Sequence, residues 1–129
     1  MKHILAALLC FASIATLTAA QNPTVIARDG KAALSIVVPD NASVETSRIA
    51  GVLGDYLEKI SGAAFTISDG KPSKGIFLSV VSGNKIPILK REDYTIKTAG
   101  GSLSLSGNSE QGLEHAVWDL LRQLGHRQF

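Results

Sequence analysis

Cysteine is almost absent from this chain, since Cys10 is the only one among 129 residues. It lies in an apolar N-terminal segment that we expect to be removed, so the mature protein would contain none. Without cysteine a protein can form neither disulfide bonds nor a thiolate metal site, and its stability must come from the core alone. This excludes a disulfide-rich extracellular domain and favours a periplasmic or secreted protein of bacterial type.

The chain also lacks a large excess of either charge. It has 13 Lys and Arg against 11 Asp and Glu, and aromatic residues make up only 5%. Lys71, Lys74, Lys90 and Arg91 are scattered cations with no aromatic residues between them. A protein that binds nucleic acid needs a basic surface, with stacking aromatics where it holds single strands. We therefore expect no nucleic-acid partner, while 45% apolar content argues against disorder.

Residues 1–20 form the one long apolar run and have the pattern of a signal peptide. Lys2 and His3 precede an apolar stretch from Ile4 to Leu17, and residues 18–20 (TAA) place small side chains before a cleavage site. The stretch is shorter than the roughly 20 apolar residues that span a bilayer. Leu8 and Leu9 before the cysteine argue against a lipid anchor. We therefore expect a secreted or periplasmic protein that has no membrane contact after cleavage.

Residues 21–129 are too few for two domains or for a complete (β/α)8 barrel of about 250 residues. We expect a single α/β domain over this range. Two segments have the spacing of amphipathic helices, one over about 43–61 and one that starts after 107–109 and ends near 124. Their apolar positions are Ile49, Val52, Leu53, Tyr56, Leu57 and Ile60 in the first, and Leu113, Ala116, Val117, Leu120, Leu121 and Leu124 in the second.

The strands that we expect are short and separated by turn signals. Residues 24–27 and 33–38 would form a hairpin around Asp29-Gly30, and residues 94–97 and 103–106 a second hairpin around 99–101. Residues 65–68 and the strongly apolar 75–81 are the remaining strands, the latter in the centre of the sheet, and 85–93 would be a surface loop. The order β-β-α-β-β-β-β-α predicts an α/β fold of the α+β type, with two helices on one face of a largely antiparallel sheet.

No combination of residues predicts a catalytic, cofactor-binding or metal site. His115 and His126 are eleven positions apart, and Asp119 stands where a zinc-protease motif would continue after Glu114-His115. Glu92 and Asp93 are adjacent on the expected loop, which suits a solvated charge run better than a sugar-cleaving pair. Gly107-Asn108-Ser109 has the position of a phosphate-binding turn but only one glycine, so we interpret it as a helix cap. The serines outside the signal segment include Ser79, Ser82, Ser104 and Ser106, and none lies in a Gly-x-Ser-x-Gly turn.

Trp118 is the only tryptophan and lies beside the apolar stripe of the second helix. Two roles remain open for it: packing against the core, or stacking on a sugar or a neighbouring domain. Tyr56 falls inside the stripe of the first helix, and we expect it in the core.

Several motifs together resemble a known module. They are residues 53–63 (LGDYLEKISGA), 75–78 (GIFL), 94–97 (YTIK), 103–107 (LSLSG) and 112–129 (GLEHAVWDLLRQLGHRQF). The sequence resembles the N-terminal α/β domain that precedes the catalytic barrel in α-glucuronidases and in glycoside hydrolase family 20 β-N-acetylhexosaminidases. It is also similar to uncharacterised exported bacterial proteins with this module. The resemblance implies a sheet covered by two helices and docked against a (β/α)8 barrel that holds the catalytic acids.

No catalytic residue of that family has a matching position here, so the resemblance implies a protein that is not itself an enzyme. We expect a non-catalytic accessory domain of an exported carbohydrate-active enzyme, truncated before a following barrel domain. That barrel would be its partner, docked on an exposed apolar patch that includes Trp118 or Phe129. The alternative is a stand-alone periplasmic module that binds a glycan or a protein, which makes carbohydrate the second candidate partner.

Overall fold

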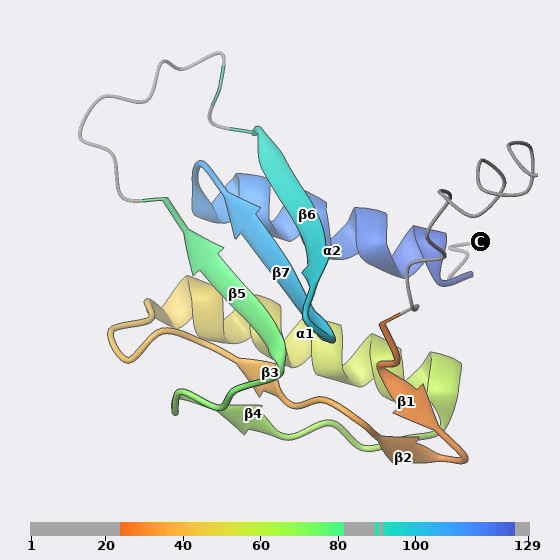
Figure 1. Cartoon of the computed structure of the whole chain (residues 1–129). Coiled ribbons are helices and arrows are strands. Elements are labelled where there is room, and N and C mark those ends of the chain that lie inside the picture. The colour runs from red at the N-terminus through yellow and green to blue at the C-terminus, as the bar shows by residue number, and fades with distance from the viewer. Residues whose placement is uncertain (1–23, 82–89, 91, 126–129) are drawn as a thin grey trace, which may run out of the picture.

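The computed structural model describes residues 24–81, 90 and 92–125. Two helices and seven short strands follow one another along the chain (Figure 1). They are β1 (Ala27–Arg28), β2 (Lys31–Ala32), β3 (Ile36–Val37), α1 (Val44–Ser61), β4 (Ile67–Ser68), β5 (Ile76–Val80), β6 (Tyr94–Ala99), β7 (Ser102–Gly107) and α2 (Glu110–Gln123). The expected loop over 85–93 lies mostly outside the described residues.

Both helices begin and end where local signals in the sequence place them. The Ser43 hydroxyl accepts a hydrogen bond from the backbone N–H of Thr46 at the start of α1, and Ser109 does the same for Gly112 at the start of α2. The N–H of Gly62 donates to the carbonyl of Glu58 where α1 ends. The predicted helices are therefore confirmed almost to the residue, and Gly107-Asn108-Ser109 is a helix start, as interpreted.

The main sheet has the strand order β4-β3-β5-β7-β6. The α+β class is confirmed, and β5 is central as predicted. The prediction of a largely antiparallel sheet is wrong, because β3 runs parallel to both β4 and β5, and β5 runs parallel to β7. Only β6 and β7 pair antiparallel within this sheet, through the turn at Gly100 and Gly101, where φ is positive.

The expected hairpin near residue 30 is shorter than predicted. β1 and β2 pair antiparallel around Asp29 and Gly30, which both have positive φ, and they form a separate two-stranded sheet. Ile36 and Val37 leave this hairpin and pair with β4 and β5 instead. The side chain of Ile36 is fully buried in the core. Because removing an apolar side chain from water is favourable, this burial favours pairing of the segment with the main sheet.

Both helices lie against one face of the main sheet, as predicted (Figure 1). Side chains from the two helices and from β3, β5 and β7 share one hydrophobic core between the layers. The fully buried large side chains in it are Ile36, Ile49, Leu53, Leu57, Ile76, Leu105, Leu113, Val117 and Leu121.

The opposite face of the main sheet has no helix over it among the described residues, and we call it the open face. Successive strand residues point to opposite faces, so neighbours of core residues lie here. Its side chains are mostly hydroxyl-bearing, and they align across the strands in the observed register. We define the open face by Val37, Phe77, Ser79, Thr95, Lys97, Ser104 and Ser106.

Candidate functional site

A hollow of about 540 Å³ lies where β3, β4 and β5 end. We call it the open-face hollow, because Val37, Phe77 and Ser79 of the open face contribute to it. The chain that follows β3 and the chain that follows β4 form its walls. Its full lining is Val37, Val38, Pro39, Asp40, Asn41, Asp69, Gly70, Lys71, Pro72, Phe77, Leu78 and Ser79.

Parallel pairing creates this hollow. Because β3, β4 and β5 run in the same direction, their carboxyl ends lie at the same end of the sheet. The segments that follow β3 and β4 therefore lie beside the second half of β5. The strand that follows β3 in the chain is β4, on one side of it, whereas the strand that follows β5 is β6, which lies on the other side, beyond β7. Ligand sites of parallel sheets lie where neighbouring strands send their connections in opposite directions. The open-face hollow is at this switch point, between β3 and β5.

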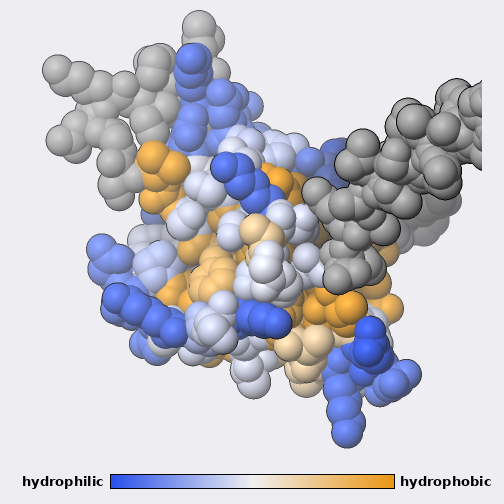
Figure 2. All heavy atoms as spheres, in the orientation of Figure 1, coloured by the Kyte–Doolittle hydropathy of each residue, from blue (hydrophilic) through white to orange (hydrophobic). Residues whose placement is uncertain are grey.

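The floor of the open-face hollow is apolar, on a face that is otherwise polar. Val37 is only 5% exposed and Phe77 is half-buried, whereas Ser79 and Ser104 beside them are exposed. A Cβ on Gly75 would lie 2.8 Å from Cγ2 of Val37, so the valine packs closely against the glycine. Figure 2 looks onto this face, where pale and blue surface surrounds an apolar area near the middle.

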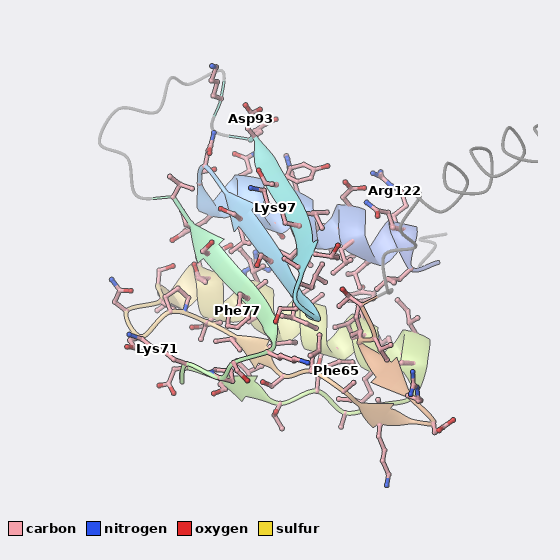
Figure 3. All side chains as sticks on the ribbon, viewed as in Figure 1. Phe65, Lys71, Phe77, Asp93, Lys97 and Arg122 are labelled. Carbon is pink, nitrogen blue, oxygen red and sulfur yellow. The ribbon has the colours of Figure 1, made fainter. Side chains whose placement is uncertain are left out.

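The rim of the open-face hollow carries exposed polar side chains: Asp40, Asn41, Asp69 and Lys71. None of the four has a side-chain hydrogen bond or an ion pair within the part of the chain that the structure describes. Figure 3 shows Phe77 in the middle of the open face, with Lys71 and Lys97 on either side in this view. The rim therefore offers carboxylate, amide and ammonium groups above an aromatic ring.

A second concave surface, the helix-end groove, lies where α1 and α2 end. It has a volume of about 340 Å³ and is lined by Thr24, Val25, Ile26, Ala27, Leu57, Ile60, Ser61, Phe65 and Leu124. Ile60 and Leu124 are each 39% exposed, although the helical spacing placed both in the apolar stripes. These stripes run past the end of the sheet, which leaves apolar side chains in solvent there.

The start of α1 and that of α2 are joined by polar contacts. The Ser43 hydroxyl donates to Oε1 of Glu110, and Arg48 forms ion pairs with Glu45 and with Glu114 at 2.5 and 3.1 Å. The hydrogen bond from Arg48 lowers the pKa of the Glu45 carboxyl. These side chains form hydrogen bonds and ion pairs with one another on the solvent side of the helices, an arrangement that is typical of a structural network.

Trp118 and Tyr56 pack against each other between the helices. Their rings meet edge to face with centroids 5.1 Å apart, and Nζ of Lys59 lies 4.7 Å from the Tyr56 ring centroid. Both aromatic residues are half-buried against the core. The packing role that we considered for Trp118 is thus confirmed, and Phe129, the other residue of the expected docking patch, lies outside the described residues.

The remaining candidates from the sequence do not come together. His115 is half-buried on α2, Ser104 and Ser106 lie on the open face, and Glu92 accepts a hydrogen bond from Gln111. No group of three or more potential metal ligands occurs among the residues of the described ranges. Ser82, Arg91 and His126 lie outside these ranges. The helices within these ranges are also too short or too polar to cross a bilayer.

Sequence reasoning missed the open-face hollow. Its lining comes from three separate segments, and only the parallel pairing brings them together. One signal in the sequence could have indicated it. Phe77 lies between Ile76 and Leu78 in a strand, and side chains along a strand alternate between the two faces of the sheet. If Ile76 and Leu78 are buried in the core, the aromatic ring of Phe77 must lie on the opposite face.

The described fold is that of an α+β module found inside much larger glycoside hydrolases. A family GH138 enzyme that targets pectin rhamnogalacturonan II matches 70% of this chain with a TM-score of 0.57 and 16% identity. A family GH115 4-O-methyl-α-glucuronidase with specificity for decorated arabinogalactans matches 78% with a TM-score of 0.60 and 16% identity. The matched region is only 13% and 14% of those two chains. No protein-family model and no curated protein matches the sequence.

The resemblance to α-glucuronidases is therefore confirmed at the level of the fold. The resemblance to family 20 β-N-acetylhexosaminidases stays a prediction.

Proposed function

We propose that this chain is a non-catalytic accessory domain of an exported carbohydrate-active enzyme and that it packs against a (β/α)8 catalytic domain. One observation supports this most directly: the chain matches two glycoside hydrolases over most of its own length but over only 13% and 14% of theirs. Export is supported by the signal-peptide pattern of residues 1–20.

The acidic groups of the open-face hollow and of the helices, within the described residues, support a non-catalytic role. Asp40 and Asp69, the two carboxylates of the open-face hollow, are both exposed at its rim. A glycosidase needs one carboxylic acid in an apolar environment that keeps it protonated at neutral pH. Four acids of the two helices, Glu45, Glu110, Glu114 and Asp119, are instead engaged in hydrogen bonds and ion pairs.

The helix-end groove is the surface that suits this docking best. Leu124 follows directly on α2 and lies in the groove, so a domain joined after α2 would start beside this surface. Ile60 and Leu124 would lose their exposure to water in the contact, and burial of apolar area favours association. The open face, with its serines, threonine and lysine, is a poorer match for a protein interface core.

The proposal can be tested by co-expressing the full chain with the (β/α)8 domain encoded beside it and measuring co-purification. We expect a 1:1 complex. Leu124→Asp should weaken it at least tenfold, because a carboxylate would be buried in an apolar contact. The matched control is Val44→Asp, since Val44 is 89% exposed at the start of α1 and is not part of the groove.

Two results would contradict the proposal. One is the absence of any (β/α)8-coding sequence in the same or the adjacent reading frame. The other is glycosidase activity of the purified chain that Asp40→Asn or Asp69→Asn abolishes.

A further inference from the structure

We propose that the open-face hollow binds a neutral sugar residue of a glycan. The parallel strands β3, β4 and β5 determine where this site lies. The choice of a glycan as its ligand rests on the proposed function. A neutral sugar is the chemical class that the lining fits, for three reasons that concern its floor, its rim and its charge.

The floor fits the apolar side of a sugar ring. The C–H groups of a pyranose form a flat apolar patch that packs on an aromatic ring, while its hydroxyl groups point outward. Phe77 is half-buried and Val37 is buried, so the two form a firm apolar base whose position is set by β5 and β3. A volume of about 540 Å³ lies within the range of small-ligand sites.

The rim fits the hydroxyl groups of the sugar. A sugar hydroxyl both donates and accepts hydrogen bonds, so it needs partners of both kinds. Asp40 and Asp69 supply acceptors, Lys71 supplies donors, and Asn41 supplies both. Within the described residues their side chains have no other partner, so binding a sugar would break no contact that the structure shows.

The charge of the rim selects against acidic ligands. Two carboxylates and one ammonium group line the open-face hollow, so one negative charge is left over. A phosphate, a sulfate or a uronate placed here would be repelled by Asp40 and Asp69, with Lys71 as the single counter-charge. A neutral sugar meets no such repulsion.

The open face also gives a longer glycan a surface beyond the hollow. On this face Ser104 lies between Phe77 on one neighbouring strand and Lys97 on the other. Ser79 lies opposite Ser106. These side chains continue from the hollow across the sheet and offer hydroxyl and ammonium groups to further sugar residues.

The proposal can be tested by amide-resolved NMR of the full chain, titrated with neutral gluco-, xylo- and galacto-oligosaccharides. Oligogalacturonides of equal length are the acidic comparison. We expect at least one neutral oligosaccharide to shift the amides of Val37, Asp69, Gly70 and Phe77 in a saturable manner. Its affinity should exceed that of the oligogalacturonide at least tenfold.

Phe77→Ala should lower the affinity for the neutral oligosaccharide at least tenfold. Phe65→Ala is the matched control, because Phe65 is also a half-buried phenylalanine but lies in the helix-end groove, and it should change this affinity less than twofold. If the spectrum of Phe77→Ala shows an unfolded chain, Asp69→Asn at the exposed rim becomes the deciding variant. We expect it to lower the affinity for the neutral oligosaccharide at least threefold.

The proposal is overturned if none of these sugars shifts the named amides, if the oligogalacturonide binds as well as the neutral chains, or if the deciding variant binds normally. These results leave the co-purification with the catalytic domain unaffected. Loss of that co-purification, in turn, leaves the amide shifts unaffected, so the two proposals fail separately.

Discussion

At the scale of single residues, Gly107 shows how tightly β7 and α2 are joined. A Cβ at this position would lie 2.1 Å from the backbone nitrogen of Leu113 and 2.6 Å from the carbonyl oxygen of Ser109. Both atoms belong to the backbone around the first turn of α2, which cannot move aside as a flexible side chain can. The absence of a side chain at Gly107 therefore lets the strand end directly against the helix start.

We predict that Gly107→Ala lowers the free energy of unfolding by about 3 kcal/mol, because the added methyl group overpacks a backbone contact. The control is Gly51→Ala in α1, where a Cβ meets no atom within 4 Å. That substitution should raise the free energy of unfolding by up to about 1 kcal/mol, since alanine is the better helix former. Urea unfolding followed by circular dichroism measures both, and equal effects at the two glycines would contradict the structure.

At the scale of elements, the sequence was sufficient for the helices but not for the sheet. Caps such as Ser43 and Ser109 act within a few residues, so a local pattern can locate the helices. Alternation along β5 shows which side chains share a face but not which strand lies beside it. The prediction paired residues 33–38 with 24–27 in an antiparallel hairpin, whereas β3 pairs in parallel with β4 and with β5.

The same limit applies to the open-face hollow. Asp40, Asp69 and Phe77 are far apart along the chain, and each alone has the character of an ordinary turn or strand residue. Their meeting depends on the strand order, which long-range burial decides.

A hydrogen bond ties the edge strand β6 to α2. The Tyr94 hydroxyl donates to Oδ2 of Asp119 at 2.8 Å, and Arg122 pairs with the other carboxylate oxygen. The hydrogen bond from Tyr94, followed by that from Arg122, lowers the pKa of the Asp119 carboxyl. A lowered pKa in the folded state means that the contact stabilises the protein above the ordinary carboxyl pKa. This stabilisation is lost as the pH falls through the lowered value.

We predict that Tyr94→Phe raises the pKa of Asp119 back toward its ordinary value, because the largest cause of the shift is removed. A carbon-detected NMR titration of the carboxyl groups measures this. The Glu45 carboxyl at the start of the other helix, whose pKa is lowered by the hydrogen bond from Arg48, is the internal control, and its titration should be the same in both proteins. An unchanged Asp119 titration in the variant would mean that the hydrogen bond to Tyr94 does not form in solution.

At the scale of the whole molecule, the stability of the described fold depends on one hydrophobic core between a sheet and two helices. The only cysteine of the chain, Cys10, lies outside them, so no covalent cross-link supports this core. A domain of about 100 residues held in this way is stable by roughly 5–15 kcal/mol.

We predict that the full chain unfolds in urea in a single transition whose midpoint is unchanged by a reducing agent. Circular dichroism and tryptophan fluorescence should report the same midpoint, because Trp118 packs between the two helices of this core. A midpoint that falls on reduction would show that Cys10 forms a stabilising bond between two chains.

The open face has a consequence for how this protein can change over time. Ser79, Thr95, Lys97 and Ser104 are exposed there, while the core lies on the other side of the same strands. Substitutions at such exposed positions usually alter stability by less than about 0.5 kcal/mol. Mutation can therefore vary the chemistry of this surface while the fold persists, so related modules can diverge in what they recognise without having to evolve a new architecture.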